Sequence, residues 1–263
     1  MGSTLGPRQQ RRELTVLVTG FAPFRGFPKN PAWEIADSLP EYLPPADPSP
    51  PSPGEASSAT LDTSFPLVRI VVYHKPIPVT YADVNAVVPT LWDAQARREH
   101  YDLAVHIGMA GAEILYKLEA CAHRDGYIYK DADGQLLPEK PREDWSGLPA
   151  VLDTDVDVAD VAERWKAHCP MHTKTIISHD PGRFICDYIY YSSLAELANR
   201  NEEKRVVFMH VPDNFNEKAV AYGTEVCLAL IRSLVESKLA KEKIQAAVED
   251  PQPAAEAEAT VAS

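Results

Sequence analysis

The sequence predicts an α/β protein, a three-layer α/β/α sandwich with a mostly parallel central sheet. Short apolar runs rich in β-branched residues recur along the chain, and longer segments with apolar residues at helical spacing lie between them. This alternation is typical of parallel strands whose crossover helices cover both faces of the sheet. The length of 263 residues allows one large α/β domain or two small ones.

The expected strands are apolar segments bounded by turn-forming residues. They cover residues 14–19, 67–73, 101–107, 114–122, 175–178 and 205–212. The first expected helix has Asn30 as its N-cap and Pro31 in its first turn, as helix starts favour, and it ends by Pro40. Later helices are expected at residues 80–98, 154–168, 183–199 and 216–247.

These elements are expected to form one domain over residues 14–247. The segments 1–13 and 248–263 are polar or low in complexity, and both are expected to be disordered. Seven prolines fall within residues 44–66, which predicts a surface insertion without a core of its own. Residues 130–149 are rich in Asp, Gly, Pro and Lys and are expected to form a second excursion from the fold.

Composition excludes several classes of protein. The formal charge of −12 argues against non-specific binding to nucleic acid or to an anionic membrane. No apolar run approaches the roughly 20 residues that a membrane span needs, and the first 13 residues lack the apolar core of a secretory signal. Four scattered cysteines, with no Cys-x-x-Cys or His-Glu-x-x-His motif, predict neither a disulfide scaffold nor a zinc site. A reducing, cytoplasmic setting fits this pattern.

Cys186 lies where a strand, a tight turn and a helix follow one another. The expected strand 175–178 is broken by Asp180-Pro181-Gly182, and a helix is expected from about Arg183. Cys186 then falls in the first turn, where unpaired backbone N–H groups and the positive end of the helix dipole favour a thiolate. The sequence therefore makes Cys186 a candidate nucleophile. The alternative is a small buried apolar residue.

Two more side chains can complete a catalytic triad. His210 lies near the carboxyl end of the last expected strand and can act as general base and acid, and Glu119, on the fourth expected strand, can orient its imidazole. The residues alone leave alternatives at both positions. His106 and His179 compete for the role of the base, and a lone acidic residue on a strand often faces solvent.

The first expected strand runs into a loop that contains Gly, Pro and the aromatic residues Phe21 and Phe24. Aromatic side chains are unusual in loops, which are mostly polar. One explanation is a flat apolar pocket at the carboxyl end of the strand, where α/β folds bind ligands. The other is that both rings fold back beneath the loop as core residues. The residues alone leave the two explanations open.

Five blocks of sequence, found in order, make the chain resemble the type I pyroglutamyl peptidases, also called pyrrolidone-carboxylate peptidases. The blocks surround the aromatic loop, a Pro-Ile-Pro-Val segment, the glutamate, the cysteine and the histidine. They cover residues 18–24 with 30–34, 76–79, 106–111 with 118–127, 178–191 and 208–212. One block alone is a weak signal, whereas five in order are highly specific. The similarity extends over roughly residues 14–240.

The resemblance implies a cysteine peptidase that removes an N-terminal pyroglutamyl residue from small peptides. It implies a triad of Glu119, Cys186 and His210, with a thioacyl intermediate on the cysteine. No metal or organic cofactor is needed for this chemistry. The sequence leaves open whether the protein is a monomer or a homo-oligomer.

The resemblance also implies a pocket for the pyroglutamyl lactam, a flat and uncharged ring. Phe21 and Phe24 are expected to contact its faces, with Asn30 and Arg183 as further substrate-binding residues. Pro181 departs from the family, which usually has Ala at that position, and it removes a backbone donor just before the nucleophile. The insertion at 44–66 and the excursion at 130–149 lengthen loops near the expected site.

The sequence leaves two alternative functions to consider. A catalytically weak or inactive relative could bind N-terminally blocked peptides without cleaving them, although the intact triad argues against it. A nucleotide-binding α/β module is the alternative from another class. No Gly-x-Gly-x-x-Gly or Walker sequence follows the first expected strand, so the sequence does not favour it.

Overall fold

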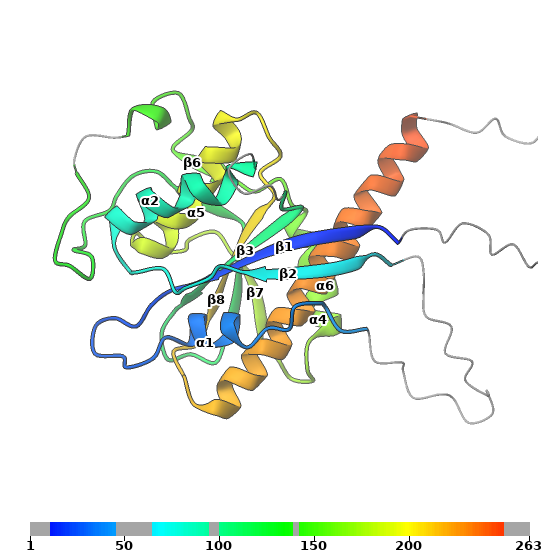
Figure 1. The fold of residues 1–263 in the computed structure, drawn as a ribbon, viewed down its shortest axis with the longest axis horizontal. Helices are drawn as coiled ribbons and strands as arrows, with labels where there is room; N and C mark the ends of the chain where they lie inside the picture. Colours follow the sequence, from blue (N-terminus) through cyan, green and yellow to red (C-terminus); the bar gives the residue numbers. More distant parts are fainter. Residues whose placement is uncertain (1–10, 46–64, 95–99, 139–141, 250–263) are drawn as a thin grey trace, which may run out of the picture.

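The computed structural model describes residues 11–45, 65–94, 100–138 and 142–249. Residues 1–10, 250–263 and 46–64, which hold most of the expected disordered ends and of the Pro-rich insertion, lie outside the described residues. The expected three-layer α/β/α architecture is confirmed: one central sheet lies between two groups of helices (Figure 1).

The central sheet has six strands. In spatial order they are β2 (Leu67–Val72), β1 (Glu13–Gly20), β3 (Leu103–Met109), β8 (Val206–Val211), β4 (Tyr116–Glu119) and β7 (Thr175–Ser178). The pairs β2–β1, β1–β3 and β3–β8 are parallel, β4 is antiparallel to β8, and β7 is parallel to β4. The sheet is therefore mostly parallel, with β4 and β7 reversed at one side.

Helices cover both faces of this sheet (Figure 1). The helices α1 (Pro31–Asp37), α4 (Val158–His168) and α6 (Glu217–Glu249) lie on one face, and α2 (Tyr81–Trp92) and α5 (Ile185–Asn199) lie on the other. Successive strand residues point to opposite faces, so each strand feeds two cores. Val207 and Met209 of β8 enter the core beneath α6, whereas Phe208 enters the core beneath α5.

The start of α1 follows the sequence prediction. Asn30 is its N-cap, its side chain accepts a hydrogen bond from Ala32 N, and Pro31 occupies the first turn. This cap ends the loop that leaves β1, so it also positions the aromatic loop at residues 21–29. No helix among the described residues is both long and apolar enough to cross a membrane.

Three expected elements differ from the structure. The single strand expected at 114–122 is divided: β4 joins the main sheet, whereas β5 (Cys121–His123) pairs with β6 (Val151–Asp153), which the sequence did not predict. A short 3₁₀ helix, η1 (Glu143–Trp145), forms within the excursion. The helix expected over 80–98 ends at Trp92, because Asp93 leaves helical geometry; residues 95–99 lie outside the described residues.

The strand expected to be buried at 175–178 lies instead at the edge of the sheet. Ile176 and Ile177 of β7 are 44% and 39% exposed. An apolar run resembles a central strand in the sequence, but burial also requires a neighbour on each side, and β7 has only β4.

Candidate active site

Glu119 and His210 form a buried pair on the α5 face of the sheet. In the β4–β8 ladder Glu119 lies opposite Phe208, and His210 follows two residues later on the same face of β8. Glu119 is fully buried and His210 is 4% exposed. His210 Nδ1 lies 2.7 Å from Glu119 Oε1. The surface alternative for Glu119 is therefore wrong, and the carboxylate is placed to orient the ring.

Cys186 is the second residue of α5, the helix that covers this face of the sheet. A Cβ atom added to Gly108 would lie 2.9 Å from Cys186 Sγ and 2.5 Å from the Phe208 ring, so the sulfur packs against the backbone of β3 at Gly108. Gly108 is also the residue that pairs with His210 in the β3–β8 ladder. Cys186 and His210 thus converge on Gly108. Among the described residues, no hydrogen bond joins the thiol to His210.

The electrostatic environment of Cys186 differs from the sequence expectation. Burial, followed by the nearby carboxylates of Glu119 and Asp187, raises the pKa of the Cys186 thiol to about 12. The backbone hydrogen bonding at the helix start acts in the opposite direction but is the smaller effect. Burial and the two carboxylates therefore oppose the effect that the sequence predicted from the helix terminus. The resting group is a neutral thiol that needs a base.

Asp187, the next residue, is a buried carboxyl group that the sequence analysis did not single out. Its Oδ1 accepts a hydrogen bond of 2.9 Å from His123 N, and its Oδ2 lies 3.4 Å from Arg183 Nη1. Burial raises the pKa of Asp187 to about 7. These contacts tie the first turn of α5 to the turn that follows β5.

The two competing histidines lie elsewhere. His106 is fully buried, and its two ring nitrogens lie 2.7 Å from Thr19 Oγ1 and 2.8 Å from Ser193 Oγ. Burial lowers the pKa of His106 to about 3, so this ring stays neutral. His179 is exposed on the loop after β7. No cluster of three or more His, Cys, Asp or Glu side chains in the described part of the chain is suited to a metal ion.

The aromatic loop places its two phenylalanines differently. Phe21 is 4% exposed, lies within the core beneath α2 and α5, and bridges to Ile77. This position matches the core explanation. Phe24 is half-buried, and its ring stacks on that of Phe184 with the centroids 6.1 Å apart. Phe184 is the N-cap of α5, two residues before Cys186, so Phe24 borders the candidate nucleophile.

Asn30 and Arg183 have partners within the protein. Asn30 Oδ1 accepts from Ala32 N and its Nδ2 donates to Ala22 O, so both ends of the amide hold the loop. Arg183 Nη1 donates to Asp180 Oδ1 at 2.7 Å. Both residues shape the loops around Phe24 and Cys186, and the Arg183 side chain is 33% exposed.

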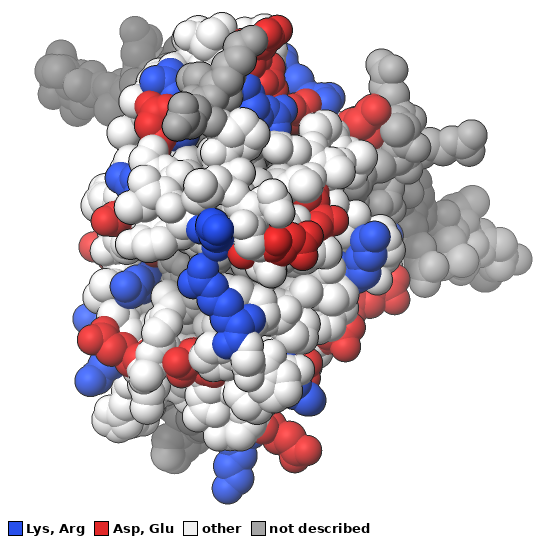
Figure 2. Space-filling model, turned by 90° about the vertical axis from the view of Figure 1, so that its left-hand side faces the viewer, with Lys and Arg blue, Asp and Glu red and all other residues white. Residues whose placement is uncertain are grey.

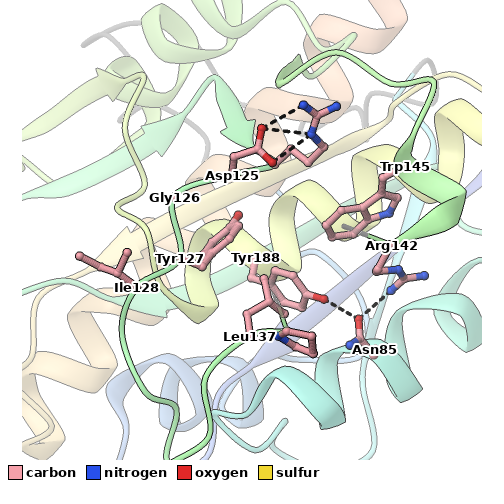
Figure 3. Close-up of a pocket in the computed structure, with 11 residues that line it drawn as sticks. Asn85, Asp125, Gly126, Tyr127, Ile128, Leu137, Arg142, Trp145 and Tyr188 are labelled. Carbon is pink, nitrogen blue, oxygen red and sulfur yellow. Dashed lines mark hydrogen bonds and ion pairs between the residues drawn. The ribbon is translucent and has the colours of Figure 1, made fainter. Parts of the chain in front are cut away.

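A separate hollow of about 370 Å³ is lined by residues of α2, of α5 and of the segment between β5 and β6 (Figure 3). Tyr188, Tyr127 and Trp145 form its aromatic wall, and Tyr188 Oη donates to Asn85 Oδ1 of α2 at 2.8 Å. Tyr188 follows Cys186 by two residues, which places the two side chains on opposite sides of the helix. This hollow is therefore not the space in front of the candidate nucleophile.

Sequence reasoning missed several residues that shape the site. Gly108 ends the third expected strand, but only the structure brings the sulfur against it. Phe184 and Asp187 flank Cys186, and their partners lie on loops distant in sequence. A run of aromatic and acidic residues beside a candidate nucleophile is the one signal that could have identified them.

The fold and the buried pair beside a cysteine define the class: an α/β protein with a candidate cysteine-hydrolase site. The comparisons are more specific. The model of the pyroglutamyl peptidase family matches residues 43–246, and pyroglutamyl-peptidase 1 of Homo sapiens is 30% identical over 197 residues, which are 75% of this chain and 78% of the relative. A pyrrolidone-carboxylate peptidase of Bacillus cereus is 25% identical over 205 residues, covering 75% and 78%. The chain belongs to the pyroglutamyl peptidase family, and it is accordingly a peptidase.

Solved structures support the fold. A pyrrolidone carboxyl peptidase mutant from Pyrococcus furiosus superposes with a TM-score of 0.62 at 20% identity, over 85% of this chain and 99% of that one. Pyroglutamyl peptidase I from Bacillus amyloliquefaciens gives 0.61 at 21% identity, over 85% and 95%. The family match contains Glu119, Cys186 and His210 but begins after the aromatic loop.

Proposed function

We propose that this peptidase hydrolyses the bond after an N-terminal pyroglutamyl residue in small peptides, with Cys186 as nucleophile, His210 as general base and acid, and Glu119 as the group that orients His210. The observation that carries the proposal is the buried Glu119–His210 pair, 2.7 Å apart, on the face where Cys186 packs. We place the enzyme in the cytoplasm, because a thiol nucleophile stays active where thiols are kept reduced.

The first step must create the nucleophile. With its Nδ1 proton directed to Glu119, His210 has the Nε2 lone pair free to accept the Cys186 proton. This transfer is required because burial raises the pKa of Cys186 to about 12. The negative charge of Glu119 disfavours an isolated Cys186 thiolate, but it stabilises the imidazolium that forms on His210. Glu119 therefore assists the proton transfer from Cys186 to His210.

The chemical steps then follow the pattern of acyl transfer. The Cys186 sulfur bonds to the carbonyl carbon beyond the lactam, and backbone N–H groups in the first turn of α5 stabilise the oxyanion. The C–N bond breaks as the His210 imidazolium gives its proton to the leaving amine. Water, deprotonated by His210, attacks the thioester, and the proton returns to the Cys186 sulfur as pyroglutamate leaves.

The lactam is proposed to lie against Phe24 and Phe184. Phe184 precedes Cys186 by two residues, and the Phe24 ring stacks on that of Phe184. Both rings are less deeply buried than Phe21. A flat, uncharged ring gains from contact with aromatic faces and needs no charged partner. Phe21 supports this wall from the core.

Turnover of a neutral pyroglutamyl-coumarin amide tests the proposal. The wild type and Cys169→Ala should hydrolyse it, and iodoacetamide should abolish the activity of both. Cys169 follows α4 and is half-buried, which makes it a matched control. Cys186→Ala and His210→Ala should be inactive while folded, as checked by circular dichroism. An active Cys186→Ala protein overturns the mechanism, whereas a folded wild type that binds but does not cleave indicates an inactive binder.

A further inference from the structure

Arg25 lies beside the proposed lactam wall as an exposed cation. It is in the loop between β1 and α1, at the left of Figure 1 and on the face shown in Figure 2. Its φ of +49° and that of +81° at Gly26 turn the chain back on itself. The guanidinium carbon lies 4.8 Å from the centre of the Phe184 ring and 5.7 Å from that of Phe24.

The charge of Arg25 has no carboxylate partner among the described residues. Its Nη2 donates a hydrogen bond of 3.0 Å to the backbone carbonyl of Lys130. Lys130 is itself exposed, and its ammonium group likewise forms no ion pair with a described residue. Figure 2 shows Lys and Arg side chains near the centre of this face, with acidic side chains beside them.

Most other described arginines differ in this respect. They pair with an Asp or Glu within 4 Å; examples are Arg12, Arg124, Arg142, Arg164, Arg183 and Arg200. Arg11 and Arg232, like Arg25, donate to a backbone carbonyl instead, but only Arg25 lies beside the proposed lactam wall. In a chain with a formal charge of −12, an unpaired cation has many available acidic partners. An arginine held in place by two aromatic rings and a backbone carbonyl, with its charge unused, is suited to an anion from outside.

We propose that Arg25, assisted by Lys130, binds a carboxylate in the leaving part of the substrate, so that peptides with an acidic residue after the pyroglutamyl group are preferred. This inference rests on the proposed function. The lactam is uncharged and contacts the rings, so it does not need the cation. Phe184 is the ring nearest the guanidinium, so a lactam that lies against Phe184 has Arg25 close by.

The neighbouring charges do not cancel this effect. Arg183 and Asp180 form an ion pair of 2.7 Å, and Asp187 is buried beneath Arg183. Among the described residues, Arg25 and Lys130 therefore supply the unpaired positive charge beside the proposed lactam wall. Because both are exposed, salt should weaken their attraction for a carboxylate over a Debye length of about 10 Å at 0.1 M.

Three peptide amides of equal length test the inference: pyroglutamyl-Glu, pyroglutamyl-Gln and pyroglutamyl-Lys, each followed by the same neutral residues. For the wild type at low ionic strength, we expect kcat/KM for the Glu peptide to exceed that for the Lys peptide by about three- to tenfold. The ratio should fall toward one in Arg25→Gln, remain raised in Arg25→Lys, and fall toward one for the wild type at about 0.5 M salt.

Arg11→Gln is the matched control. Arg11 is an exposed arginine just before β1, at the end of the strand opposite to the loop, and it also donates to a backbone carbonyl, that of Phe65. For Arg11→Gln, the ratio of kcat/KM for the Glu peptide to that for the Lys peptide should equal the wild-type ratio. Three results would overturn this inference while the wild type still cleaves the Gln peptide: a ratio of kcat/KM for the Glu and Lys peptides near one, a ratio that salt does not change, or the same ratio in Arg25→Gln. The proposed function would stand in each case. If Arg25→Gln does not fold, the salt series on the wild type and Lys130→Gln decide the question. Failure to cleave any of the three peptides contradicts the proposed function instead.

Discussion

Glu119 uses only one of its two carboxylate oxygens. Oε1 contacts His210, whereas Oε2 is buried and has no hydrogen-bond partner among the described residues. A buried carboxylate left partly unpaired is costly, and such a group persists where its charge has a role. Here the carboxylate lies against the His210 ring, a group that can become positive.

Replacing Glu119 by Gln should therefore damage catalysis more than stability. We expect kcat/KM to fall by about two orders of magnitude, roughly 3 kcal/mol of transition-state stabilisation, with the acidic limb of the pH–rate profile displaced to lower pH. The imidazolium loses its negative neighbour while the shape of the side chain is kept. Glu113→Gln, at an exposed position before β4, is the control. Near-normal activity with an unmoved profile would show that Glu119 does not act on the base.

Gly108 is required by close packing rather than by its backbone conformation. A Cβ atom there would overlap the Phe208 ring at 2.5 Å and approach the Cys186 sulfur at 2.9 Å. We expect Gly108→Ala to displace the nucleophile and to lower kcat/KM by at least about tenfold, with some loss of thermal stability. Gly147→Ala is the comparison, because nothing lies within 4 Å of the added atom. Equal activity in the two variants would mean that Cys186 does not depend on this contact.

At the scale of elements, α5 carries the nucleophile and also anchors it. Its first turn packs Cys186 on the sheet and joins Asp187 to His123 N on β5. Tyr190, further along the helix, donates to the backbone carbonyl of Glu119 at 3.0 Å. The helix therefore links the nucleophile to both β4 and β5, which are consecutive in the chain but belong to different sheets.

Asp187 makes this element sensitive to pH. Its pKa rises from 3.8 to about 7 on folding, so its contribution to stability is present below about pH 4 and is lost as the pH rises through 7. We expect the melting temperature of Asp187→Asn to fall less than that of the wild type as the pH rises from about 4 to 7. The pH dependence of Cys186 alkylation should also move to lower pH, since Asp187 raises the pKa of that thiol.

Thermal unfolding measured between pH 4 and 8 checks this prediction, with the exposed Asp133→Asn as the control. Parallel curves for the wild type and Asp187→Asn would contradict it, because the buried carboxyl could not then be the group that titrates.

At the scale of the whole molecule, the two faces of the sheet have different roles. The face beneath α1, α4 and α6 holds an apolar core, whereas Glu119, Cys186 and His210 all lie on the face of α2 and α5. Alternation along β4 and β8 decides this placement, because a shift of one residue would turn both side chains to the other face.

Much of this arrangement could be predicted from the sequence, because it depends on local patterns. Apolar runs and caps located β1, α1, α5 and β8, and the spaced blocks identified the family. The reversed direction of β4 and the edge position of β7 could not be predicted, since both depend on which strands pair.

The candidate site could likewise be predicted only in part from the sequence. The residue types of the triad are visible in the sequence, but the raised pKa of Cys186 arises from burial and from the carboxylates of Glu119 on β4 and of Asp187 on α5 itself. Phe21 and Phe24 look equivalent in the sequence, and only tertiary packing buries Phe21 and leaves Phe24 beside Phe184. The sequence analysis did not single out Arg25, because the lack of a carboxylate partner among the described residues is a property of the fold.

The central claim is that Cys186 carries the pyroglutamyl group during turnover. Acid quenching of the enzyme while it turns over a pyroglutamyl substrate, followed by trypsin digestion and mass spectrometry, tests this most directly. Cleavage after Arg183 and Arg200 releases a peptide, residues 184–200, whose one cysteine is Cys186. We predict a pyroglutamyl thioester on this peptide of the wild type and none on the corresponding peptide of Cys186→Ala. An acyl group on the peptide of Cys121, Cys169 or Cys227, or turnover by Cys186→Ala, would contradict the account.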